Sequence, residues 1–218
     1  MTGAEVVAAP VLVLRGVVLA AGGAPYDLVL RPGEVAALSD PDSSDLLWAV
    51  AGLGDVVSGQ ILVDDRVIAT HEDALAAGVA LVPQGSALAS LLTALENVLL
   101  PLAEQSAQDP VPEGSAAESD LAARARQALA DVGLAESADH LVEELSGGQQ
   151  QRVAVARAVA ARPRLLLADQ ATTDLDAGNR ARVVDLLRTL AASGTAVLLV
   201  SDDAAVVERC DRIITRSL

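Results

Sequence analysis

Two four-residue segments, residues 165–168 and 197–200, contain almost only Leu, Val and Ala, with a helical repeat of apolar positions at 183–190 between them. A strand that is apolar on both faces must be covered on both faces, as in a parallel sheet with helices packed against it. Alternating strands and helices therefore predict an α/β fold with a parallel sheet. Other short apolar runs bounded by turn residues predict further strands, at residues 11–14, 28–30, 35–38, 61–63, 79–82 and 212–215.

The helices are expected from apolar periodicity and from their end signals. An apolar run at 46–53 predicts a short helix that ends at Gly52 or Gly54. A second helix is predicted where Leu121, Ala125, Leu129 and Val132 recur at helical spacing. Residues 103–120 are rich in Ala, Glu, Ser, Asp and Pro, which indicates a solvated loop or a frayed helix.

The composition excludes several classes of function. The net charge of the 218 residues is −15, and all 15 basic residues are arginine, so the chain has no lysine. With 1% aromatic residues as well, a protein that follows nucleic-acid phosphates or stacks on bases is excluded. Cys210 is the only cysteine, and no apolar run reaches the ~18 residues that a membrane helix needs. We expect a cytosolic protein that acts at a membrane, if at all, as a peripheral partner.

The most informative motif is the octet Leu-Ser-Gly-Gly-Gln-Gln-Gln-Arg at residues 145–152, which is followed by an apolar helix-forming run to Ala161. Ser146 is suited to cap that helix, and Gly147 and Gly148 allow the backbone to approach a ligand closely. Exposed N–H groups and the helix dipole favour a phosphate at such a position.

This octet resembles the signature motif of the ABC-type ATPases, and the likeness extends from about residue 11 to the C-terminus. Five further segments resemble elements of the same family: the Q-loop at 82–84, the stretch that follows it at 92–102, the Walker B strand at 164–170, the D-loop at 175–176 and the switch-histidine loop at 200–203. The Leu-Thr-x-x-Glu-Asn-Val stretch is most similar to the lipoprotein-releasing, macrolide-exporting and cell-division branch of the bacterial ATPases.

The resemblance implies a P-loop NTPase core with a parallel sheet, an N-terminal antiparallel β part and an inserted helical subdomain. Residues 1–84 and 151–218 would form the RecA-like and β core, and residues 85–150 a helical subdomain that ends in the signature motif. The abundance of Ala, Arg and Asp without lysine suggests a GC-rich bacterial source.

A working ATPase of this family needs Gly-x-x-x-x-Gly-Lys-Ser/Thr between an early strand and helix, where backbone N–H groups and lysine hold the phosphates. The corresponding residues 38–47 contain neither glycine nor lysine and are about three residues short. Asp40, Asp42 and Asp45 place negative charge there instead. One such carboxylate about 4 Å from a phosphate charge costs ~4 kcal/mol at an effective dielectric constant of ~20. Ser43 or Ser44 could offer one hydroxyl.

Two further positions differ from the family pattern. Asp169 is followed by Gln170, which cannot accept a proton as the family's glutamate does, and Asp202 replaces the switch histidine. His71 and His140 are expected at the surface. On these grounds we expect a degenerate pseudo-ATPase that is not an enzyme, with no catalytic residue, no metal ligand and no nucleotide bound at its own site.

The retained positions predict a role in a heterodimer. In this family ATP lies between two subunits, and Ser146, Gly147, Gly148 and Gln149 would complete the ATP and Mg²⁺ site of an intact second ATPase. Asp169 and Asp176 also match the family pattern, and Asp176 would help communication across the dimer. Gln84 would meet transmembrane permease subunits at the cytoplasmic face of the cell membrane.

Three alternatives remain. A structural or regulatory scaffold would bind the same partners without completing any site. A self-sufficient homodimeric ATPase would have to bind nucleotide without a lysine. A chromosome-maintenance ATPase shares a similar signature motif, but coiled-coil heptads and a basic surface are missing here.

Overall fold

The computed structural model describes residues 8–39, 43–105 and 116–215. A five-stranded sheet forms the centre of the described chain, with all of its strand pairings parallel. Its strands lie in the order β6 (Val79–Val82), β7 (Leu165–Asp169), β8 (Ala196–Val200), β3 (Val35–Leu38) and β9 (Arg212–Ile214). The predicted α/β class with a parallel sheet is confirmed.

The central strands are buried on both faces because alternate side chains point into two different cores. Leu165 and Leu167 of β7 pack in one cluster with the N-terminal strands, whereas Leu166 and Ala168 pack in the other cluster with the helices. Each of these four side chains is at most 1% exposed. The wholly apolar sequence of β7 therefore follows from its place between two layers.

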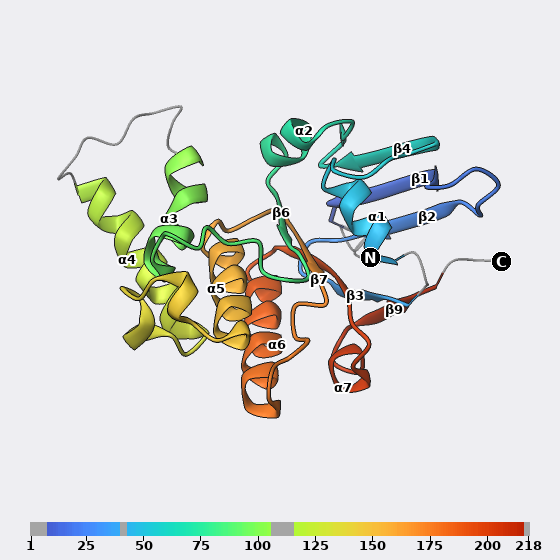
Figure 1. Ribbon diagram of the computed structural model, residues 1–218. Helices are drawn as coiled ribbons and strands as arrows, with labels where there is room; N and C mark the ends of the chain where they lie inside the picture. The colour runs from blue at the N-terminus through green and yellow to red at the C-terminus, as the bar shows by residue number, and fades with distance from the viewer. Residues whose placement is uncertain (1–7, 40–42, 106–115, 216–218) are drawn as a thin grey trace, which may run out of the picture.

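An antiparallel sheet covers one face of the parallel sheet, with the helix α1 (Ser43–Val50) between the two sheets (Figure 1). Its strands lie in the order β2 (Tyr26–Leu30), β1 (Leu12–Val18), β4 (Ser58–Val63) and β5 (Arg66–Val67). The short helix α2 (His71–Ala76) leads from this sheet to β6. The expected N-terminal antiparallel part is confirmed.

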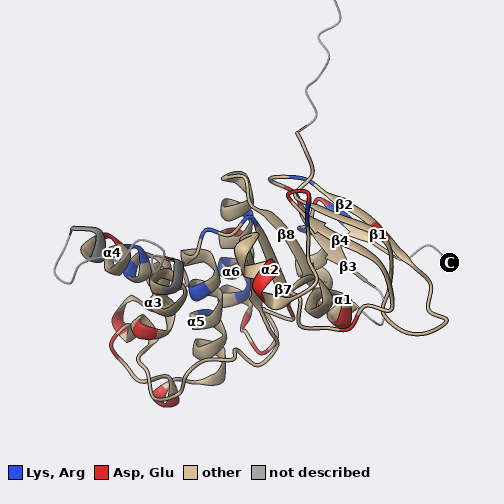
Figure 2. Cartoon of the chain, turned by 90° about the horizontal axis from the view of Figure 1, so that it is seen from above, with Lys and Arg blue, Asp and Glu red and all other residues tan. Residues whose placement is uncertain are grey.

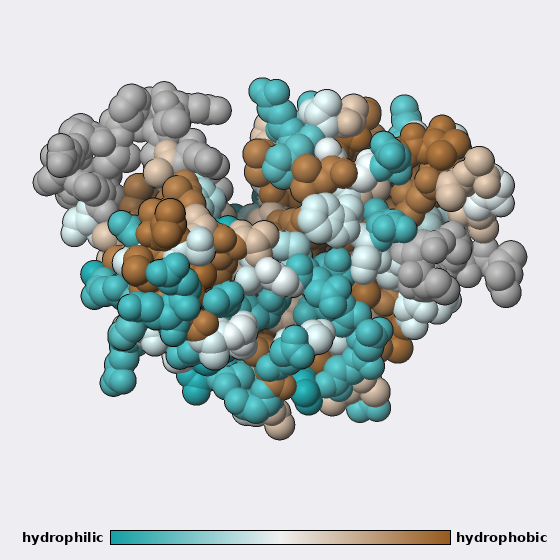
Figure 3. Space-filling view, in the orientation of Figure 1, coloured by the Kyte–Doolittle hydropathy of each residue, from teal (hydrophilic) through white to brown (hydrophobic). Residues whose placement is uncertain are grey.

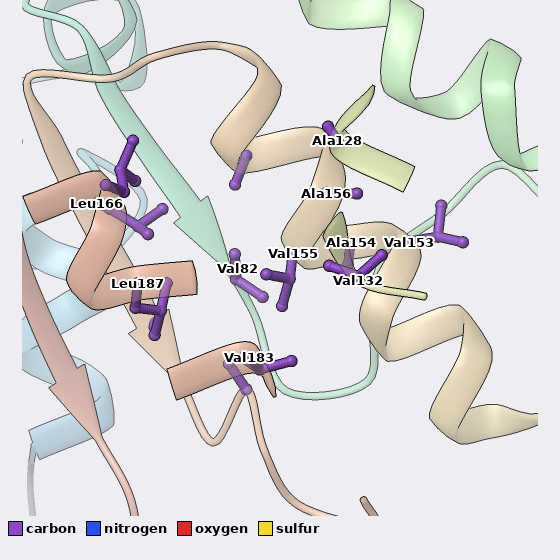
Figure 4. Packing of buried hydrophobic residues seen from close by; sticks show 14 of the residues in the cluster. Val82, Ala128, Val132, Val153, Ala154, Val155, Ala156, Leu166, Val183 and Leu187 are labelled. Atoms are coloured by element: carbon purple, nitrogen blue, oxygen red, sulfur yellow. The ribbon is translucent and has the colours of Figure 1, made fainter. Parts of the chain in front are cut away.

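The helices α5 (Gly147–Ala160) and α6 (Ala177–Ala192) cover the opposite face, and α3 (Ala94–Gln105) and α4 (Ala116–Asp131) pack against α5 farther from the sheet (Figure 1). The 3₁₀ turns η2 (Ala135–Ser137) and η3 (Val142–Glu144) lie between α4 and α5 in the chain. Figure 4 shows Val155 of α5 beside Val82 of β6, with Val183 and Leu187 of α6 on the other side, whereas Val153 lies on the side of α5 that is turned away from β6. The helix α5 thus lies in the middle of the helical layer.

Several elements differ from the sequence prediction. The helix expected at 46–53 begins at Ser43 and ends at Val50, because the chain turns at Gly52, where φ is +69°. The elements β5, α2 and α7 (Ala204–Val207) were not predicted, since each is too short to show a periodicity. In the stretch expected to be loop or frayed helix, α3 continues to Gln105 and α4 begins at Ala116.

No helix in the described ranges is both long enough and apolar enough to span a membrane.

Candidate functional site

The signature segment forms the exposed N-terminus of α5. Ser146 is the N-cap: its Oγ accepts a hydrogen bond from the backbone N–H of Gln149 at 3.4 Å, and Gln149 Oε1 accepts from the backbone N–H of Ser146 at 2.9 Å. This reciprocal pair satisfies two of the N–H groups at the helix end. The N–H groups of Gly147 and Gly148 have no partner within a helix, and they point out of its positive end.

The two glycines have different surroundings. A Cβ on Gly147 would meet no atom of this chain within 4 Å, whereas a Cβ on Gly148 would lie 3.4 Å from Leu175 Cδ2 and 3.5 Å from the carbonyl oxygen of Asp174. Gly148 is therefore backed by the turn that precedes α6, and Gly147 faces open space. The signature segment and the predicted D-loop lie side by side.

Asp176 begins α6 beside this turn. Its Oδ1 accepts a hydrogen bond from the backbone N–H of Asn179 at 2.8 Å, which caps the helix. That bond, with the Asn179 side chain and the charge of Arg152 on α5, holds the pKa of Asp176 below its ordinary value. Burial, and then the charge of Arg182 on α6, lower the pKa of Arg152. Figure 2 shows basic positions on both α5 and α6. Asp176 is therefore ionised at neutral pH.

A second group of predicted residues surrounds Asp169, at the C-terminal end of β7. The Asp169 side chain is 3% exposed. Its Oδ1 accepts a hydrogen bond from Ser44 Oγ at 2.8 Å, and its Oδ2 accepts one from Trp48 Nε1 at 3.3 Å. The structure thus brings Ser44 and Asp169 together. Sequence reasoning missed Trp48, although its position four residues after Ser44 places both on one face of the helix.

The pair fits a Mg²⁺ ion in residue type. In P-loop ATPases the ion is held by a hydroxyl at the start of the first helix and by the Walker B aspartate, and Ser44 and Asp169 supply these two groups. A bound Mg²⁺ would neutralise phosphate charge there. The chain has no lysine that could hold the phosphates of a nucleotide. Ser43 is buried and Asp45 is exposed in the first turn of α1, whereas Asp40 and Asp42 lie outside the described residues.

Gln170 lies between the two loops that follow β7 and β8. Its backbone has a φ of +50°, in the left-handed region. Its Oε1 accepts a hydrogen bond from Thr173 Oγ1 at 3.2 Å and one from the backbone N–H of Asp202 at 3.4 Å. The predicted positions 170 and 202 are therefore in contact, through the backbone N–H of Asp202. The residue Asp202 is itself exposed.

Gln84 lies apart from both groups, in an exposed turn after β6. Arg157 of α5 holds the same turn by donating hydrogen bonds to the carbonyl oxygens of Ala87 at 2.9 Å and Ser86 at 3.4 Å. Among the described residues, no hydrogen bond joins Gln84 or the signature segment to Asp169. His71 and His140 are both exposed, and His71 Nδ1 lies 2.8 Å from the carbonyl oxygen of Ala51.

Comparison with known proteins shows the family. The model of the ABC transporter family matches residues 42–173. The glutamine transport ATP-binding protein GlnQ of Escherichia coli K12 is 35% identical over 189 residues, which are 84% of this chain and 75% of that protein. The uncharacterized ABC transporter ATP-binding protein YbbA of the same organism is 39% identical over 197 residues, 86% of this chain and 82% of the relative.

Solved structures agree with the sequence comparison. The dimeric structure of MJ0796, a bacterial ABC transporter cassette, superposes with a TM-score of 0.80 at 30% identity over 94% of both chains. Another structure of the same cassette, in a post-hydrolysis state bound to ADP and Pi, gives a TM-score of 0.80 at 29% identity over 94% of both chains. The fold is that of an ABC ATPase cassette.

These findings correct one prediction. The expectation that the chain is not an enzyme is wrong, because its relatives are ABC ATPases named as ATP-binding proteins. That expectation rested on residue types at the loop, at Gln170 and at Asp202. Residue types alone could not show that folding pairs Ser44 with Asp169, the two groups of the Mg²⁺ side. The chain belongs to the ABC transporter family, as an ATP-binding subunit.

Proposed function

We propose that this subunit pairs with a different ABC ATPase subunit and that its signature segment, Ser146 to Gln149, completes the partner's site for ATP and Mg²⁺. The observation that carries this proposal is the open space in front of Gly147, where a Cβ would meet nothing within 4 Å. An exposed helix N-terminus with outward-pointing N–H groups is suited to bind a phosphate. That phosphate would have to be supplied from outside this chain, since no described residue of the chain lies there.

We also propose that the loop before α1 holds no ATP in the family's usual pose. The absence of lysine and the exposed Asp45 in the first turn of α1 support this. Residues 38–47 offer no positive charge to the phosphates, and each carboxylate near them adds repulsion. The dimer would then hydrolyse ATP at the composite site that this chain completes. One nucleotide per dimer at saturating ATP is expected, and two would contradict this part of the proposal.

The helical part is proposed to meet transmembrane permease subunits, which would place the protein at the cytoplasmic face of the membrane as a peripheral subunit. Gln84 is exposed in its turn, and Leu91 and Leu100 nearby in the chain are 78% and 42% exposed. Figure 3 shows hydrophobic surface on the side of the molecule that carries α3 and α4. Residues 85–150 would form the helical subdomain, although α5 continues past residue 150 to Ala160.

The experiment is a substitution of Gly147 by leucine in this subunit, followed by assay of the assembled transporter. Because the site of the new side chain is open in this chain, the subunit should fold and assemble. ATP hydrolysis by the complex should fall by at least about a hundredfold, as when one transition-state donor is lost.

The matched control is Asp169→Asn in this subunit, which should reduce hydrolysis far less because it leaves the signature segment intact. Full ATPase activity of an assembled Gly147→Leu complex would contradict the proposal. It would favour a scaffold that binds the same partners without completing a site.

A further inference from the structure

Arg180, in the first turn of α6, links two loops that come from different strands. Its Nη2 donates a hydrogen bond to the carbonyl oxygen of Leu175 at 3.1 Å. Its Nε lies 2.9 Å from Asp203 Oδ2, with the two side chains 33% and 31% exposed. One guanidinium therefore holds the turn after β7 and the loop after β8 at the same time. The contact with Leu175 is a hydrogen bond, and the contact with Asp203 is an ion pair in which Nε makes no hydrogen bond within the described residues.

One of the two residues that Arg180 holds, Leu175, lies directly behind the signature segment. Leu175 Cδ2 and the carbonyl oxygen of Asp174 are the atoms closest to the Cβ position of Gly148. Asp174 has a φ of +64°, in the left-handed region, which aspartate adopts in turns more readily than most other residues. A shift of this turn would therefore move or release the N-terminus of α5.

The loop after β8 is itself fixed. Asp203 uses its other oxygen, Oδ1, to accept a hydrogen bond from the backbone N–H of Ala205 at 2.9 Å, which caps α7. Gln170 makes a second connection between the same loops, through Thr173 and the backbone of Asp202. All of these contacts are made between side chains and backbone groups of this chain.

We propose that Arg180 is a positioning residue for the signature segment: by joining Leu175 to Asp203, it keeps the turn behind Gly148 in place without a nucleotide at this subunit's own site. The partner-facing surface is then preformed, and α5 presents its N–H groups to ATP at a fixed position. Preformed donors cost no reorganisation when charge develops in the transition state. The effect on hydrolysis rests on the proposed function, whereas the effect on the turn does not.

The test is hydrogen–deuterium exchange of the purified full chain carrying Arg180→Ala. Amides of residues 171–176 and 146–150 should exchange about tenfold faster than in the unmodified protein, since one charge-assisted contact is worth about a tenfold change in local opening. The control is Arg188→Ala. Arg188 lies on the same helix and pairs with Asp211 at 3.5 Å, remote from Gly148.

Two further variants separate positioning from general stability. Arg180→Lys keeps the charge beside Asp203 but cannot bridge to Leu175, so exchange should be intermediate. Asp203→Asn removes the charge that pairs with Arg180 but retains an oxygen that can cap α7. In a protein that carries Asp203→Asn, adding Arg180→Ala should therefore accelerate exchange less than it does in the unmodified protein. In the assembled transporter, Arg180→Ala should lower kcat about tenfold and leave KM for ATP unchanged.

Unchanged exchange at 146–150, or acceleration equal to that of Arg188→Ala, would overturn the assignment. Additive effects of the Arg180 and Asp203 substitutions on the exchange rates would also overturn it. Faster exchange at both segments combined with an unchanged kcat would leave the positioning role intact and contradict the proposed function instead.

Discussion

At the residue scale, the buried carboxylate of Asp169 depends on donors from α1. A carboxyl group on a residue that is 3% exposed needs hydrogen bonds to offset its loss of water, and Ser44 and Trp48 supply them. The same two bonds fasten the start of α1 to the end of β7. Ser44 and Asp169 belong to separate sequence motifs, and in the structure they form one unit.

Replacing Ser44 by alanine should destabilise the protein. The substitution removes the 2.8 Å bond to Asp169 and leaves a buried carboxylate oxygen without that donor. The expected loss in the free energy of unfolding is about 1–3 kcal/mol, measured from the urea unfolding midpoint. Ser90→Ala, at an exposed position, is the control. Equal midpoints for the two variants would show that the Asp169 contact contributes nothing.

The thiol of Cys210 should react slowly at neutral pH. Burial, and then the charge of Asp211, raise the pKa of Cys210 from 9.0 to about 11, so the neutral form is favoured in the folded protein. Its contribution to stability is therefore present below pH 9 and is lost as the pH rises toward 11. Alkylation by iodoacetamide should accelerate about tenfold per pH unit from pH 8 to pH 10. A rate that levels off by pH 9 would refute the raised pKa.

At the element scale, helix ends determine how neighbouring segments meet. The C-terminal turn of α1 lies against the N-terminus of α2, where Thr70 and Asp73 form a capping box. Gly52 is at this junction, and a Cβ on it would lie 2.2 Å from the carbonyl oxygen of Thr70. The approach of the two helices requires a glycine there.

Gly52→Ala should therefore be much more damaging than Gly85→Ala. Both glycines have positive φ, +69° and +84°, but a Cβ on Gly85 would meet nothing within 4 Å. Backbone strain alone should cost about 1 kcal/mol at Gly85, and the added clash should raise the cost at Gly52 to about 3 kcal/mol. Thermal unfolding of the two variants measures the difference. Similar melting temperatures would mean that α2 can move away from α1 freely.

At the scale of the whole molecule, the parallel sheet separates two cores. One contains the N-terminal strands and α1, and the other contains α3 to α6. Because every central strand contributes to both, neither layer can lose its packing without exposing the sheet. The protein is expected to unfold as one cooperative unit.

Leu166→Ala and Leu167→Ala test this cooperativity, since the two side chains enter opposite cores and are both 0% exposed. Each variant should lose about 2–5 kcal/mol of stability. Each should still unfold in a single urea transition with an unchanged m value, followed by both circular dichroism and Trp48 fluorescence. Two separated transitions in either variant would show that the layers unfold independently.

Much of the fold was predictable because its strands are short, apolar and bounded by turn residues. Residues 79–82 and 197–200 were predicted as strands, and residues 35–38 form β3 as expected. The elements that escaped prediction, α2, β5 and α7, are held by capping and pairing contacts rather than by a periodic pattern. Tertiary contacts set such short elements.

The sequence by itself determined the family, through the octet at 145–152 and the segments that accompany it, and it determined the capped helix that Ser146 begins, because these features are local. Only the tertiary structure decided which distant residues meet. Trp48 and Ser44 reach Asp169 because α1 lies across the end of β7. Arg180 joins Leu175 to Asp203 because β7 and β8 are neighbours in the sheet. Side-chain hydrogen bonds act over about 3 Å, and only the packed sheet brings residues so far apart in the chain within that distance.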